Sequence, residues 1–174
     1  GHVGRFLLNA LEMQGFVNVV PVYRKISNKN LRGRALEADF VSKNFTDEVK
    51  QQFKDADIVI NLAAAVPKTS DIGSIEASVN LAIAENLVSL CAEKAFFINC
   101  STAEVYGPQT KDLIDECSIC KPVSNYSKSK LDVENFLDDR SKKNSDFNYS
   151  NLRITNVIGP GESIKRSTYL FIES

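Results

Sequence analysis

The sequence predicts an α/β fold with a parallel sheet. Helical and strand-like segments alternate along its 174 residues, which is typical of parallel strands joined by helices. The strand-like segments are apolar and β-branched, as strands buried inside such a sheet are. An ordinary composition, with 43% hydrophobic and 25% charged residues, indicates one soluble globular domain.

The first part of the chain is expected to form one helix and two strands. Apolar side chains share one face of residues 5–14, and Gly15 follows where a glycine commonly ends a helix. The β-branched run 16–23 predicts a buried strand, despite a proline within it. Residues 36–39 predict a shorter strand.

The alternation continues in the rest of the chain. Thr46 is expected to cap an amphipathic helix to residue 53, and longer helices are expected at 72–94 and 126–137. The apolar strands expected between and after these helices are 57–62, 96–100 and 150–154. They run into polar or glycine-rich turns, and ligands bind at such strand ends in open α/β sheets.

The charge balance excludes some partners. The net charge of −1 gives no electrostatic reason to expect a nucleic acid or a membrane surface. The longest apolar run, 58–67, is interrupted by Asn61 and is too short to span a bilayer. No secretory signal is evident, and a reducing cytoplasm fits best, although position 1 need not be the natural start.

The four cysteines leave more than one interpretation open. Cys117 and Cys120 form a C-x-x-C, which suits a redox pair or half of a zinc site. A structural zinc site needs four ligands, whereas Cys91 and Cys100 fall in a helical pattern and at a strand end. We therefore expect no metal and favour inert thiols, with a redox pair as the alternative.

The chain opens on a glycine pair that leads directly into a helix. Gly1 and Gly4 match the second half of a dinucleotide-binding loop, in which glycines let the backbone approach a pyrophosphate. A plain turn is the alternative. The strand and first glycine that such a loop requires are not in this chain, and that strand would lie at the centre of the sheet.

Tyr126 and Lys130 stand four residues apart on a predicted helix, so both lie on one face. A lysine ammonium beside a phenol lowers the tyrosine pKa, which suits proton transfer with a hydroxyl while hydride moves at the adjacent carbon. Thr102, after Ser101 at a strand end, can hydrogen-bond the reacting oxygen. Asn80 can orient a water or the lysine. A solvated helix face is the alternative.

The sequence resembles the extended short-chain dehydrogenase/reductase family, the NAD(P)-dependent epimerase/dehydratase group. The resemblance implies one Rossmann-like, doubly wound NAD(P)-binding domain over residues 1–174, without the N-terminal strand and most of the C-terminal substrate region. It covers essentially the whole chain and rests on GHVG (1–4), DADIVINLAAAVP (55–67), INCSTAEVYGP (98–108), YSKSK (126–130) and LRITNVIGPGE (152–162).

The resemblance also implies roles for individual residues. Tyr126 would be the acid/base, Lys130 would lower its pKa and bind the nicotinamide ribose, and Thr102 would be their hydroxyl partner. Glu104 and Asn156 would face the substrate. The expected cofactor contacts are Gly1 and Gly4 at the pyrophosphate, Asp39 at the adenine, and Arg24, Leu62, Ala63, Ala64, Asn80, Tyr126 and Lys130.

Two departures from the family pattern carry information. Ala103 precedes Glu104 where dehydratases of the family have an Asp-Glu pair, which disfavours water elimination. Arg24 and Lys25 stand where an NAD-selective site has a carboxylate, and a cation suits the 2′-phosphate of NADP(H). We therefore favour NADP(H) slightly. The alternative is that Arg24 stacks on adenine or faces solvent.

The expected activity is that of an epimerase or ketoreductase acting on a nucleotide sugar, with no metal. A non-catalytic NAD(P) sensor or scaffold of the same fold is the alternative. In relatives, the helices that correspond to 72–94 and 126–137 commonly form a dimer interface, so a homodimer is a further expectation.

Overall fold

The computed structural model describes residues 1–16, 18–26, 34–65, 75–109 and 113–157. Every strand pair in these residues is parallel, so the predicted α/β fold with a parallel sheet is confirmed. One sheet pairs β1 (Val22–Tyr23) with β2 (Leu36–Glu37). The other has the order β3 (Ile58–Asn61), β4 (Phe96–Thr102), β5 (Asn148–Ile154).

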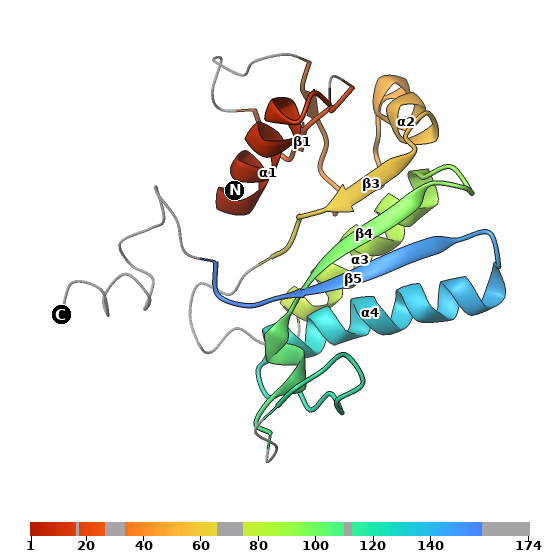
Figure 1. Cartoon of the computed structure of the whole chain (residues 1–174). Helices are drawn as coiled ribbons and strands as arrows, with labels where there is room; N and C mark the ends of the chain where they lie inside the picture. The colour runs from red at the N-terminus through yellow and green to blue at the C-terminus, as the bar shows by residue number, and fades with distance from the viewer. Residues whose placement is uncertain (17, 27–33, 66–74, 110–112, 158–174) are drawn as a thin grey trace.

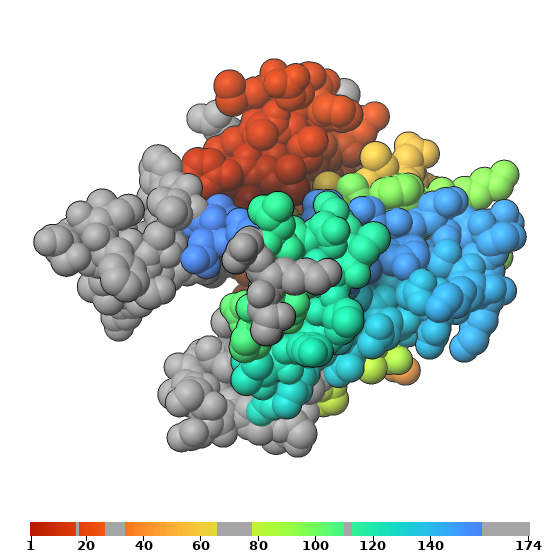
Figure 2. All heavy atoms as spheres, turned by 60° about the horizontal axis from the view of Figure 1, so that its bottom comes forward, coloured from red at the N-terminus to blue at the C-terminus, as the bar shows by residue number. Residues whose placement is uncertain are grey.

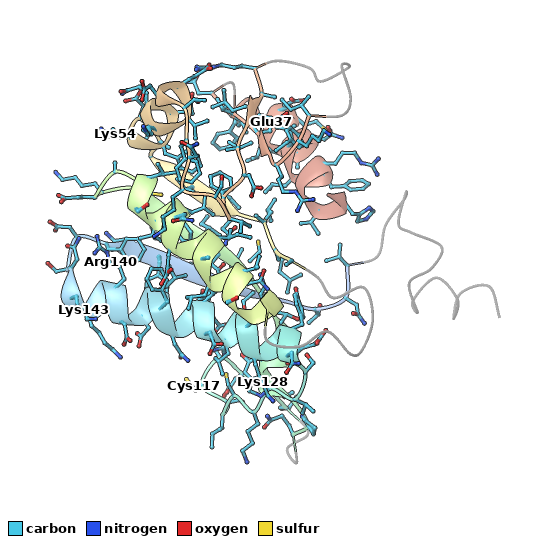
Figure 3. The ribbon with its side chains drawn as sticks, turned by 180° about the vertical axis from the view of Figure 1, so that it is seen from behind. Glu37, Lys54, Cys117, Lys128, Arg140 and Lys143 are labelled. Carbon is cyan, nitrogen blue, oxygen red and sulfur yellow. The ribbon has the colours of Figure 1, made fainter. Side chains whose placement is uncertain are left out.

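Two long helices cover one face of the larger sheet. Seen from behind, α3 and α4 lie side by side in front of its strands (Figure 3), whereas α1 stands at the opposite end of the molecule beside β1 (Figure 1). The helices are α1 (His2–Met13), α2 (Asp47–Lys54), α3 (Ile75–Leu90) and α4 (Asn125–Lys143), with a 3-10 turn, η1, at Ala103–Tyr106.

The core lies between this sheet and the two helices. Side chains alternate along β4: Phe97 is fully buried against the helices, while Phe96 on the other face is 40% exposed. Leu87 from α3 and Leu137 from α4 meet Phe97 in the core. Burial of large apolar side chains of this kind is the main source of stability for such a layer.

A ladder of three amides crosses the buried face of the sheet. Asn61, Asn99 and Asn151 occupy the same register position on β3, β4 and β5. Asn61 donates to Asn99 at 3.2 Å, and Asn99 donates to Asn151 at 2.9 Å. Because shifting a strand by one residue would turn its amide to the other face, the ladder fixes the register of all three strands.

Several local predictions are confirmed in detail. Thr46 is the N-cap of α2, and its hydroxyl oxygen accepts a hydrogen bond from Val49 N at 3.3 Å. Gly15 follows α1 with φ of +85°, the left-handed conformation expected after a helix end.

Other boundaries differ from the prediction. Within the described part of 16–23, only Val22 and Tyr23 form a strand, because only they face a partner in β2. Strand β4 extends to Thr102 because β5 pairs with it as far as Ile154. Helix α4 runs past residue 137 through a charged stretch in which Asp138 and Lys142 form an i,i+4 ion pair.

The long helix is shorter than predicted, ending at Leu90 rather than residue 94, because residues 92–95 form a turn closed by Ala95 N and Ala92 O. The predicted residues 72–74 and the glycine-rich turn at 159–161 lie outside the described residues. Of the helices in the described ranges, none is long and apolar enough to cross a membrane.

Candidate NAD(P) and acid/base site

The carboxyl ends of β3, β4 and β5 lie at one edge of the sheet, and predicted site residues meet there. Leu62 directly follows β3, and Thr102 is the last residue of β4, paired with Ile154 of β5. Asn156 is exposed two residues beyond the end of β5. The structure therefore brings three positions from distant parts of the sequence to one sheet edge, where open α/β sheets bind ligands.

Asn80 clamps the loop that follows β3. Its side-chain oxygen accepts from Ala65 N at 2.7 Å, and its nitrogen donates to Ala65 O at 3.2 Å. The same nitrogen donates to the Ser129 hydroxyl of α4 at 2.9 Å. The buried amide thus holds the segment containing Ala63 and Ala64 against α4, rather than pointing freely toward a water.

The start of α1 has the features of an anion-binding helix end. Gly1 is its N-cap and offers no side-chain cap, so the first N–H groups of this 12-residue helix are available to a ligand. A Cβ on Gly4 would lie 3.3 Å from Leu62 Cδ1. Gly4 therefore lets the helix approach the end of β3 closely.

Arg24 and Asp39 follow the two strands of the smaller sheet. Arg24 comes directly after β1 and is exposed, whereas Asp39 lies two residues beyond β2. The Asp39 carboxylate accepts from Val41 N at 3.0 Å, which orders its own turn. Because β1 and β2 are parallel neighbours, both residues lie at the same end of this sheet.

Tyr126 and Lys130 lie on successive turns at the start of α4. Ser124 caps the helix, and its hydroxyl oxygen accepts from Ser127 N at 3.0 Å. Tyr126 is half-buried and Lys130 is 4% exposed. Lys128, between them, is exposed and points away from the fold (Figure 3), so Lys130 does not belong to a solvated helix face.

Burial gives Lys130 unusual chemistry. Desolvation lowers the pKa of its ammonium, while the nearby Cys100 thiol and Glu134 carboxylate act in the opposite direction. A buried amine with a lowered pKa at a strand edge is typical of a functional site. Burial of the Cys100 thiol likewise raises its pKa, and the positive charge of Lys130 partly offsets this rise.

Replacing Lys130 with Met is expected to stabilise the fold at pH 7 by about 1 kcal/mol, or roughly 2–4 °C in Tm. Because the pKa of Lys130 is lowered on folding, the unfolded chain binds its proton more tightly. The destabilising contribution of Lys130 therefore declines as pH approaches 10, and the advantage of the variant over wild type shrinks. Thermal melts at pH 7 and pH 9.5 measure both effects.

The matched control is Lys128→Met on the same helix, which should leave Tm unchanged at both pH values because Lys128 is exposed. A lower Tm for Lys130→Met than for wild type at pH 7 would contradict the assignment of an unfavourable buried charge.

Turn η1 brings Thr102 and Glu104 next to the start of α4. The Thr102 hydroxyl oxygen accepts from Glu104 N at 3.3 Å and so caps the turn. Glu104 is exposed, and its carboxylate accepts from the Ser124 hydroxyl, the α4 cap, at 3.5 Å. The predicted substrate-facing carboxylate therefore lies beside Ser124, two residues before Tyr126, and it is also close to Thr102 in the sequence.

Gly107 closes η1 in a backbone conformation that is nearly exclusive to glycine, with φ of +61° and ψ of −163°. A Cβ on it would overlap the carbonyl oxygen of Lys121. Gly107→Ala is therefore expected to lower the free energy of unfolding by about 2–4 kcal/mol, from strain and overlap together. Urea denaturation measures the loss.

Gly15→Ala separates the two causes. Gly15 also has a positive φ, but a Cβ there would meet nothing within 4 Å. Its loss should be only about 1 kcal/mol, from strain alone. Equal losses at both positions would show that the contact with Lys121 is unimportant.

The cysteines are free thiols. Burial raises the pKa of Cys91 to about 12, and its thiol donates to Leu87 O at 3.1 Å, as expected of an inert small side chain. Cys117 is exposed and Cys120 is half-buried in the loop before α4. The redox-pair interpretation of these two stays a hypothesis.

Sequence reasoning missed the polar residues that hold the site together. Ser129 accepts a hydrogen bond from Asn80, and half-buried Arg153 pairs with buried Glu134 and donates to the Tyr106 hydroxyl. Glu134 follows Lys130 by four residues, and this spacing was a usable signal. Nothing local in the sequence pairs Arg153 with it, because the two are 19 residues apart.

A model of the NAD dependent epimerase/dehydratase family matches residues 1–173. The chain belongs to this family, as the resemblance in its motifs implied. A search of functionally curated proteins found none that matches this chain.

Solved structures with similar folds include sugar-nucleotide epimerases, and they confirm the Rossmann-like α/β architecture. UDP-glucuronic acid 4-epimerase from Bacillus cereus, in complex with NAD, superposes with a TM-score of 0.82 and 23% identity, covering 99% of this chain and 59% of that one. UDP-glucose 4-epimerase from Thermotoga maritima, with UDP-glucose, gives 0.76 and 22%, covering 94% and 55%.

UDP-N-acetylglucosamine 4-epimerase from Bacillus cereus is a third example, with a TM-score of 0.74, 22% identity, and coverage of 93% of this chain and 59% of that one. The chain thus spans somewhat more than half the length of each of these three structures.

Proposed function

We propose that this protein is an NAD(P)-dependent epimerase of a nucleotide sugar. It oxidises a secondary alcohol of the sugar to a ketone and reduces that ketone from the opposite face. The observation that carries the proposal is the Tyr126–Lys130 pair, with Lys130 buried and close to Cys100, two residues before Thr102 on β4. Family membership and the epimerases among the similar folds support it.

The chain's own residues have distinct roles in this proposal. Tyr126 takes the proton of the sugar hydroxyl on its phenolate oxygen and returns it when the ketone is reduced. Lys130 stabilises the phenolate and binds the nicotinamide ribose, and Thr102 hydrogen-bonds the reacting oxygen. Glu104 and Asn156 contact the sugar. When bound, NAD(P) supplies the acceptor and donor of the hydride.

The cofactor lies, in this proposal, along the carboxyl ends of the strands. The start of α1 holds the pyrophosphate through Gly1 and Gly4. Asp39 contacts the adenine, and Arg24 contacts a 2′-phosphate, so NADP(H) is slightly favoured. The segment Leu62, Ala63 and Ala64, which Asn80 holds in place, lines the nicotinamide half.

Two measurements test the proposal on the full-length protein. Nucleotide released by denaturation is identified and NADH and NADPH are titrated separately, and UDP-hexoses are incubated with the protein and analysed for 4-epimers. Retained cofactor with epimer formation supports the proposal. Weak, exchangeable binding with NADPH preference and no epimer would replace it by a ketoreductase, which exposed Arg24 favours.

We also propose that α3 and α4 form a homodimer interface. A shallow groove between them on their outer side is lined by Leu81, Phe136, Glu85 and Arg140, and Figure 3 shows Arg140 near the end of this helix pair. The mass of the protein in solution, with and without Phe136→Glu, tests this.

A further inference from the structure

An ion pair between buried Glu134 and half-buried Arg153 joins α4 to β5. Arg153 Nη2 lies 2.7 Å from Glu134 Oε2, and Arg153 Nε donates to the same carboxylate at 3.1 Å. The Glu134 side chain is 5% exposed and that of Arg153 is 22% exposed. Hydrogen bonding to Glu134 is the main cause that raises the pKa of Arg153, so the guanidinium stays charged.

Arg153 also binds η1 and the loop before α4. Arg153 Nη1 donates to the Tyr106 hydroxyl at 2.9 Å and to the backbone oxygen of Glu116 at 3.3 Å. The guanidinium also lies over the Tyr106 ring, 4.8 Å from its centroid. In the space-filling view, the teal loop before α4 accordingly lies beside the blue surface of β5 (Figure 2).

These segments are the ones that carry the proposed acid/base residues. The Ser101 hydroxyl donates to Glu134, and Ser101 immediately precedes Thr102. Tyr106 ends the turn that the Thr102 hydroxyl caps. On the other side, Glu134 lies one helical turn beyond Lys130. A single carboxylate on the helix that carries Tyr126 and Lys130 therefore binds the strand end that carries Thr102.

Stability alone does not account for such a pair. Replacing a buried ion pair by apolar side chains of similar size is often neutral or stabilising, because the attraction is offset by desolvation, here of Glu134 and in part of Arg153. Its bidentate geometry does, however, fix the positions of the groups that it joins. Displacement of a catalytic group by about 1 Å can lower a rate about 100-fold, so this rigidity has a large effect on chemistry.

We propose that Glu134 and Arg153 are positioning residues that set the placement of Thr102 relative to Tyr126 and Lys130, and so determine the rate of proton transfer. This inference rests on the proposed epimerase function. In this proposal, neither Glu134 nor Arg153 contacts the substrate or the cofactor. Their effect is transmitted through Ser101 and Tyr106 on one side and through the backbone of α4 on the other.

The test uses the full-length protein with Glu134→Gln and Arg153→Met combined, because removing both members of the pair leaves neither of them without the other. We expect kcat to fall about 100-fold, while the dissociation constant for NAD(P) stays within about twofold of wild type. Arg153→Lys, which keeps the charge but not the bidentate contact, should recover part of the loss.

The matched control is Tyr149→Phe. Tyr149 also donates its hydroxyl to a carboxylate of α4, Asp138, but at the far end of the helix. It should keep wild-type kcat and cofactor affinity. A folded double variant with the kcat of this control would overturn the inference.

Amide hydrogen exchange provides a readout that does not need turnover. The double variant should exchange about tenfold faster in residues 101–106 and 125–130 together, with α2 unchanged. Uniformly faster exchange would mean loss of overall stability and would overturn the inference. If wild type epimerises no UDP-hexose, the proposed function fails, and the exchange pattern still decides whether the pair couples these segments.

Discussion

Replacing Tyr126 with Phe is expected to lower turnover about 1,000-fold while the dissociation constant for NAD(P) stays within about twofold. General acid/base catalysis contributes about 10²–10⁴-fold to enzyme rates, and the phenol hydroxyl is the only group that the substitution removes. Tyr126 stands on the first turn of α4 with its ring half-buried, so Phe fits the same space. Epimerisation kinetics and cofactor titration measure the two effects.

Tyr149→Phe is again the control, because it removes a hydroxyl from a half-buried tyrosine away from the site. It should leave turnover unchanged. Full activity in Tyr126→Phe would refute the acid/base role. Absence of any activity in wild type, together with intact cofactor binding, would instead favour a non-catalytic NAD(P) sensor.

Replacing Phe97 with Ala is expected to lower the free energy of unfolding by about 3–5 kcal/mol. Phe97 is fully buried at the centre of β4, packed between the sheet and the two long helices. Truncation removes its apolar contacts and leaves a cavity that the surrounding strands and helices cannot fill. Urea denaturation followed by circular dichroism gives the value.

The neighbouring Phe96 provides the matched control on the same strand. It faces the other side of the sheet and is 40% exposed, so Phe96→Ala should cost no more than about 1.5 kcal/mol. Similar losses at both positions would contradict the assignment of the core to the face that α3 and α4 cover.

The fold could be predicted well where local patterns decide it. Thr46 and Gly15 mark helix ends through their own chemistry, and both predictions are confirmed. The limits of strands depend instead on distant partners. Val22 and Tyr23 form a strand because Leu36 and Glu37 lie beside them, and no feature within 16–23 contains that information.

In the site, too, local features could be predicted from the sequence, whereas contacts between distant residues could not. The spacing of Tyr126 and Lys130 predicted one helix face, and the structure adds that Lys130 is buried on it. Asn80 was expected near the site, but its partners Ala65 and Ser129 lie 15 and 49 residues away. Hydrogen bonds over such separations require the tertiary fold, so sequence spacing could not have identified them.

The amide ladder across the larger sheet constrains how this protein can diverge. Asn99 both donates to Asn151 and accepts from Asn61, so an apolar side chain at the middle position would leave two neighbouring amides without their partners. Replacing all three together would leave no amide of the ladder without its partner, and only Ala63 N would lose an acceptor, the Asn61 oxygen at 3.1 Å. Each single replacement along that path therefore costs more than its share of the triple replacement, and the three positions are expected to evolve as one epistatic unit.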